Sequence, residues 1–180
     1  MNTIESDKGV PFRMTSEEVL NKLQKQYCVY YDVRSGIEHK SMPFALEADF
    51  HSSSEKYVLV KSAQLWRYEN HEYVYIAAVS DLNQENFIKY MDTVLCEGLT
   101  RVKPHKEHMY THITLVLVAD NIEPALFKLI SKTHFHKDFK CSFHGWVDFR
   151  LVAFECSSGS VVSNRQGGNL KRLFDDNEMI

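Results

Sequence analysis

The sequence predicts an α/β protein of the α+β type, in which an antiparallel meander joins a parallel strand-helix-strand unit in one mixed sheet with helices on its faces. The parallel unit is indicated by residues 113–119, which are almost continuously apolar and rich in β-branched side chains, as in a strand covered on both faces. Residues 143–155 form a second β-forming run, and apolar residues at helical spacing separate the two. Because parallel crossovers are nearly always right-handed, we expect the two strands to lie parallel, with the first one inside the sheet.

Three antiparallel strands are expected before this unit. Residues 44–50 alternate between apolar and polar side chains, which is the pattern of a strand with one covered face. After a turn at 52–55, residues 57–68 form a long strand, and a tight connection at 69–71 leads to its partner over 72–79. This alternation of strands and turns predicts a meander.

Three helices are predicted from capping residues and apolar periodicity. Thr15 is followed three residues later by Glu18, which is the capping-box pattern, so the first helix is expected over 16–27. A second helix is expected to carry the apolar stripe between residues 87 and 99, and a third helix to follow residue 120. The expected caps are Ser80 and Asp81 for the second helix, and Asp120 or Asn121 for the third.

Length and composition fit one domain with a sizeable core. The chain has 180 residues, of which 44% are apolar, and no Pro-, Gly- or Ser-rich linker divides it. The globular domain is expected over residues 15–174. A disordered segment is expected over 1–14 and a frayed tail over 175–180, because both ends lack an apolar period.

Charge and cysteine usage limit the classes of partner. Twenty-four acidic residues against 21 lysines and arginines give a formal charge of −3, which provides no global attraction to nucleic acid or anionic lipid. The four cysteines form no C-x-x-C pair, the N-terminal residues are too polar for a secretory signal, and no apolar run approaches the roughly 20 residues of a membrane span. We therefore expect a cytoplasmic protein with reduced thiols, no membrane association and no structural zinc site.

Basic residues and histidines collect in two segments, 101–108 and 132–140, each of which joins the end of a helix to the start of a strand. If the two strands are parallel, both segments emerge at the same edge of the sheet and form a local basic rim. Such a rim can bind an anionic ligand such as phosphate, RNA or an acidic protein surface. A structural interpretation stays open beside it, because basic residues complement the dipole at helix C-termini. The candidate binding residues are Arg101, Lys103, His105, Lys106, His108, Lys132, His134, His136, Lys137 and Lys140.

Two histidine pairs, His108 with His112 and His134 with His136, each place two imidazoles on one face of an extended segment. Such a pair can ligate zinc, but no Cys, Asp or Glu completes a ligand set at a recognisable spacing. No metal site is therefore expected, and His112 is interpreted as a hydrogen-bonded core residue.

The segments that begin at residues 108 and 143 carry a family resemblance. The run His-Met-x-x-His-Ile-Thr-Leu-Val, followed by Phe-x-x-Gly-Trp-Val-Asp-Phe-Arg-Leu-Val, resembles an uncharacterised domain family of Gram-positive bacteria. The resemblance implies a single bacterial domain of unknown function that spans most of the chain. It carries no assigned activity or functional residues.

The order helix, three meandering strands, helix, strand is also similar to the core of the PD-(D/E)XK nucleases. That family uses an acid on the second core strand, and an acid and a lysine two residues apart on the third, to hold Mg²⁺ and orient water. Glu47 or Asp49 matches the first acid and Lys61 matches the lysine, but Leu59 stands in the place of the second acid. The motif is therefore incomplete, and a charged pair on the solvent face of a strand is the structural alternative.

The function is best described as unknown, and a binding or interaction module without a cofactor is the favoured interpretation. The alternative is a divergent metal-dependent phosphodiesterase with Glu47, Asp49 and Lys61 as catalytic residues, and only this alternative requires Mg²⁺. Convergence of these three side chains on one concavity would favour the enzyme. A flat sheet face with the three groups in water would favour the binding module.

Overall fold

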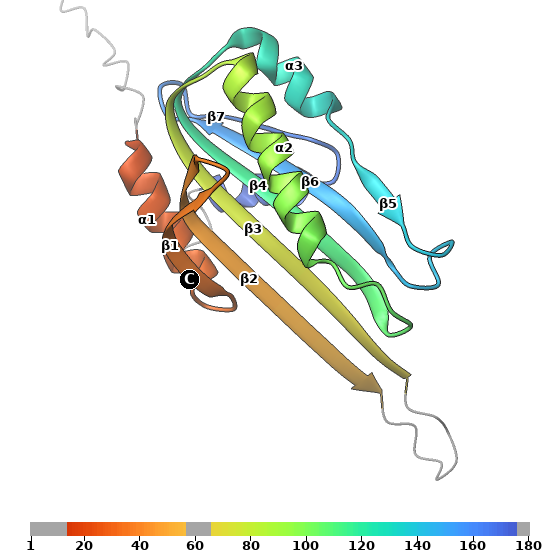
Figure 1. The fold of residues 1–180 in the computed structure, drawn as a ribbon. Coiled ribbons are helices and arrows are strands. Elements are labelled where there is room, and N and C mark those ends of the chain that lie inside the picture. Colours follow the sequence, from red (N-terminus) through yellow and green to blue (C-terminus); the bar gives the residue numbers. More distant parts are fainter. Residues whose placement is uncertain (1–13, 57–65, 176–180) are drawn as a thin grey trace, which may run out of the picture.

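The computed structural model describes residues 14–56 and 66–175 of the chain (Figure 1). The expected disordered segment up to residue 13, the expected tail from residue 176, and residues 57–65 of the expected strand 57–68 lie outside the described residues. Lys61 and Leu59 belong to this last segment.

Seven strands form one mixed sheet within the described residues, in the order β1-β2-β3-β4-β6-β5, and β7 also pairs with β6. Strands β1 to β3 are antiparallel neighbours, whereas β3, β4 and β6 run parallel, so the predicted fold class is confirmed. The strands are β1 (Asp32–His39), β2 (Met42–Lys56), β3 (Trp66–Leu82), β4 (His108–Ile122), β5 (His136–Asp138), β6 (Trp146–Glu155) and β7 (Ser160–Ser163).

Strand β4 is the interior strand of the parallel unit. Ile113 on β4 is paired with Tyr73 on β3 at one side and with Phe149 on β6 at the other. The prediction that this strand lies inside the sheet and parallel to the strand after residue 143 is therefore confirmed. Continuous burial on both faces explains why its sequence has almost no polar interruption.

Helices cover both faces of this sheet and enclose two apolar clusters. Helix α2 crosses one face, and α1 lies against the other (Figure 1). Phe87 of α2 packs in the same cluster as Leu115, whereas Leu23 of α1 packs with Val116, the next residue of β4. The helices are α1 (Ser16–Tyr27), α2 (Gln84–Arg101), α3 (Pro124–Lys132) and the 3₁₀ helix η1 (Gly168–Phe174).

Two expected turns, at 52–55 and 69–71, are wrong because both segments lie inside long strands. Ser52 pairs with Asn70 and His51 pairs with His71, so β2 continues to Lys56 and β3 starts at Trp66. Figure 1 shows that these ends of β2 and β3 project beyond α2. Polar residues are tolerated there because water covers part of the pair, so cross-strand pairing overrides the local turn preference.

The first helix begins as predicted, with a capping box between Thr15 and Glu18. The caps expected for the other helices are wrong, because β3 and β4 continue further than predicted. Asn83 caps α2 and Glu123 precedes α3 without a side-chain cap, while Asn121 donates to Asp81 across the strand ends at 3.1 Å. Strand β6 also starts later than residue 143, since residues 139–145 form tight turns.

None of the helices within residues 14–56 and 66–175 is long and apolar enough to cross a membrane.

Candidate functional site

Glu47 and Asp49 share one face of β2, as predicted, but that face lies under the C-terminal end of α2 and is not open to solvent. Glu47 is only 2% exposed. Arg101, the last residue of α2, donates to Glu47 Oε1 and to Asp49 Oδ2, each at 2.6 Å. Arg34 of β1 donates to the same two oxygens at 3.0 and 2.8 Å. Two carboxylates and two guanidiniums therefore form a neutral network.

These carboxylates do not fit Mg²⁺. The ion requires about six oxygen ligands in near-octahedral geometry, with little tolerance for a neighbouring cation. Both oxygens of Glu47 are engaged, one by the two arginines and the other by His39 Nε2 at 3.3 Å. Asp49 keeps one oxygen without a hydrogen-bond partner, but its other oxygen contacts both guanidiniums. No group of three or more His, Cys, Asp or Glu residues suited to a metal ion occurs in the described part of the chain.

A cleft of about 430 Å³ lies on the α2 face, beside this network, where β2, β3 and the connection after α2 meet. Because its lining is rich in imidazoles, we call it the histidine cleft. Its lining residues are His51, Glu69, His71, Tyr73, Arg101, Lys103 and His105.

Two histidines from opposite strands are in direct contact in this cleft. Nδ1 of His51 and Nδ1 of His71 lie 2.7 Å apart, so one ring donates a proton and the other accepts it. The pKa of His71 is lowered, first because burial disfavours the charged ring and then because His51 and His108 lie close to it. The pair holds one shared proton, and a second proton would break the contact and turn both Nδ1 atoms into donors.

A backbone hydrogen bond fixes the tautomer of His105. The backbone N–H of Glu107 donates to His105 Nδ1 at 3.2 Å, so the ring proton of the neutral form is on Nε2. That Nε2 lies 3.2 Å from Glu69 Oε2, which also lies 3.8 Å from Nε2 of His71. Glu69 is therefore the acidic group that these histidines face.

Arg101 links the histidine cleft to the buried network. Its guanidinium carbon lies 3.9 Å above the centre of the Tyr73 ring, while its N–H groups bind Glu47 and Asp49. The Tyr73 ring in turn stacks on His71 with an interplanar angle of 7°. Arg101 therefore positions one wall of the cleft, and most of its charge is already balanced.

The candidate rim residues do not gather at one site. Arg101, Lys103 and His105 line the histidine cleft, whereas Lys106 lines a neighbouring hollow of about 210 Å³ beside Trp146. His108 is only 3% exposed and has both ring nitrogens engaged. Its Nδ1 donates to the carbonyl of His144 at 2.8 Å, and its Nε2 accepts from Thr111 Oγ1 at 2.9 Å.

The second rim segment lies around β5 and does not line the histidine cleft. His136 contacts Asp148 at 2.8 Å and Asp138 at 3.0 Å, and these carboxylates raise its pKa, Asp148 most strongly. Buried His108 of the first segment lies beside the second segment, since its ring centre is 6.3 Å from that of Phe139. The other residues of this group are Lys132 at the end of α3, His134 beside Gln166, Lys137 over Phe139, and Lys140 in the turn before β6.

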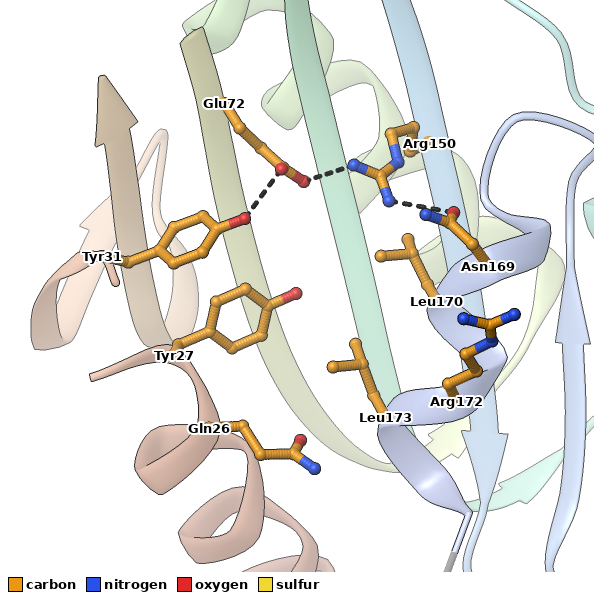
Figure 2. Close-up of a pocket in the computed structure, with 9 residues that line it drawn as sticks. All are labelled: Gln26, Tyr27, Tyr31, Glu72, Arg150, Asn169, Leu170, Arg172 and Leu173. Atoms are coloured by element: carbon orange, nitrogen blue, oxygen red, sulfur yellow. Dashed lines mark hydrogen bonds and ion pairs between the residues drawn. The ribbon is translucent and has the colours of Figure 1, made fainter. Parts of the chain in front are cut away.

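The opposite face of the sheet carries a second concavity, of about 240 Å³, between α1, β3, β6 and η1 (Figure 2). We call it the tyrosine pocket. Glu72 lies at its floor and binds three neighbours: Tyr31 at 2.9 Å, Arg150 at 2.8 Å and Thr114 at 2.7 Å. Its lining residues are Gln26 and Tyr27 of α1, Tyr31, Glu72 of β3, Arg150 of β6, and Asn169, Leu170, Arg172 and Leu173 of η1.

The fold and these concavities define an α+β domain with a mixed sheet between two helical layers and a polar hollow on each face. The chain belongs to the family DUF8052, described as a domain of unknown function, whose family model matches residues 15–176. An uncharacterised domain over most of the chain was predicted, and this match confirms it. No curated protein and no solved structure matches the chain.

Proposed function

We propose that this protein is a binding module for a phosphate-bearing anion, and that the histidine cleft is its binding site. The observation that carries the proposal is the convergence of three histidines and Lys103 from three separate chain segments on one open cleft. Lys103 is exposed and makes no ion pair within the described residues, so its charge is available to a ligand.

Protonation controls the charge of this cleft. With its histidines neutral, the cleft is lined by one ammonium group, that of Lys103, and one carboxylate, that of Glu69, while the charge of Arg101 is balanced by the buried carboxylates. Protonation of His71 would add positive charge to the cleft as the pH falls below the ordinary histidine range, because burial and the neighbouring imidazoles lower the pKa of this ring. Anion binding is therefore expected to tighten on acidification and to weaken with salt.

The proposal favours single-stranded RNA among the anionic partners, because His51, His71 and His105 offer ring edges and faces beside a cation. The four free cysteines, three of them exposed, support a reducing compartment, and we include a cytoplasmic location in the proposal. The metal-dependent phosphodiesterase is disfavoured, because arginines occupy the carboxylates that it would need.

The test is fluorescence anisotropy of a labelled oligouridylate with the full chain at low salt, between pH 8 and pH 5.5. We expect binding that tightens toward low pH, and Lys103→Gln should weaken it and reduce the slope of log K against log salt by about one. Lys137→Gln is the matched control, because this lysine is exposed on β5 and outside the cleft.

Three outcomes would overturn the proposal. They are no binding at pH 5.5 and low salt, equal losses in Lys103→Gln and Lys137→Gln, and preferential binding of a polyglutamate peptide of matched charge. The last outcome would assign the cleft to an acidic protein surface.

A further inference from the structure

We propose that the tyrosine pocket binds a small organic carboxylate. This pocket lies on the α1 face of the sheet, so it is separate from the histidine cleft: Glu72 and Tyr73 are adjacent on β3 and point to opposite faces. Its volume of about 240 Å³ is below the roughly 300–1,000 Å³ typical of sites for drug-sized molecules, which suits a small metabolite.

The first argument is an unpartnered hydroxyl. Tyr27 is only 5% exposed, and its ring packs edge-on against the ring of Tyr31, with 4.9 Å between the two ring centres. Figure 2 shows its hydroxyl directed into the pocket, where it makes no hydrogen bond with any described residue. Because no described residue accepts from it, this hydroxyl is available as a hydrogen-bond donor to a ligand or water in the pocket.

The second argument is the balance of donors and acceptors. Glu72 accepts three hydrogen bonds, so the acidic group of the pocket is already engaged. Arg150 is a guanidinium with five N–H donors, and its hydrogen-bond partners among the described residues are Glu72, Asn169 and His112. With the Tyr27 hydroxyl and the exposed Arg172 guanidinium, the groups left for a ligand are mainly donors.

The third argument is net charge. Glu72 and Arg150 neutralise each other in an ion pair, with 2.8 Å between the guanidinium nitrogen and Glu72 Oε1, and the exposed Arg172 adds a positive charge that makes no ion pair within the described residues. A monoanion with oxygen acceptors matches both the surplus of hydrogen-bond donors and the surplus positive charge. A carboxylate also matches the paired N–H groups of a guanidinium. Leu170 and Leu173 provide an apolar wall for the body of the molecule.

The test is a ¹H–¹⁵N NMR titration of the full chain with benzoate and 4-hydroxybenzoate, against the neutral isosteres benzamide and 4-hydroxybenzamide. We expect saturable shifts at residues 27, 150 and 170 with the acids, and at least about tenfold weaker binding of the amides, because a hydrogen bond to a charged group is lost. Tyr27→Phe and Arg172→Gln should each weaken acid binding by about tenfold. Lys171→Gln, an exposed neighbour on η1 outside the pocket, should leave it unchanged.

Tyr27→Phe is a sharp probe because it removes only the unpartnered hydroxyl and keeps the packed ring. The variant is expected to melt no lower than the natural chain, so weaker binding would report the site and not the fold. The proposal is overturned if neither acid shifts these residues at millimolar concentration, if acid and amide bind equally, or if folded Tyr27→Phe binds as the natural chain does.

Discussion

Substitution of Arg101 by methionine should destabilise the fold strongly, because it leaves two carboxylates under α2 without their main counter-charge. Arg101 makes charge-assisted hydrogen bonds of 2.6 Å to Glu47 and to Asp49. Removing one partner of a buried ion pair costs about 3–5 kcal/mol. The Arg101 side chain is 22% exposed and Arg34 remains beside both acids, so we expect the lower end, about 3 kcal/mol.

Urea unfolding followed by circular dichroism measures this free energy. Arg34→Met is the matched control: this arginine contacts the same two oxygens but its side chain is 53% exposed, so its loss should cost about 1 kcal/mol or less. The double variant Arg101→Met/Glu47→Gln should recover about 1–2 kcal/mol relative to additivity, because the buried charge is removed together with its partner. A cost below about 0.5 kcal/mol for Arg101→Met, or strict additivity in the double variant, would refute the network as a stabilising unit.

Three further predictions concern packing, titration and chemistry. Gly98→Ala should lower the melting temperature, because the added Cβ would lie 2.7 Å from Cδ1 of Ile113. Such overpacking costs about 1–3 kcal/mol, which exceeds the ~1 kcal/mol that alanine gains from its helix propensity. A higher melting temperature would contradict this prediction. His136 should titrate above its ordinary pKa in an NMR titration, so its contribution to stability is present below about pH 6.5 and is lost as the pH rises through the raised value; an unchanged pKa in Asp148→Asn would oppose the assigned cause. The purified chain should not cleave DNA or RNA with Mg²⁺ or Mn²⁺ above an Asp49→Ala control, and robust cleavage lost in that variant would restore the phosphodiesterase.

The parallel unit could be predicted because burial on both faces leaves a distinctive sequence. Residues 113–119 carry that signature, and the short capping box at Thr15 is equally local. The long antiparallel pair could not be predicted in the same way. Polar residues around His51 and His71 have the composition of turns, and only their pairing with each other keeps them in β2 and β3.

The candidate site shows the same limit. Lys103 and His105 lie in a basic segment that the sequence displays directly, and both reach the histidine cleft. His51 and His71 were missed because they become neighbours through the register of two strands, and no local pattern encodes that register. Arg101 was expected to bind an anionic ligand, but its guanidinium also balances the charge of Glu47. Glu47 is 54 residues away in the chain, so no local pattern indicates this contact.

Binding at the histidine cleft is tested most directly by the imidazole signals of the full chain. A ¹H–¹³C spectrum selective for histidine rings, recorded at pH 6 with and without oligouridylate, separates the cleft from the β5 segment. Binding at the cleft predicts saturable shifts of His51, His71 and His105, with His134 and His136 unchanged. Shifts confined to His134 and His136, or no shift at saturating oligouridylate, would contradict it.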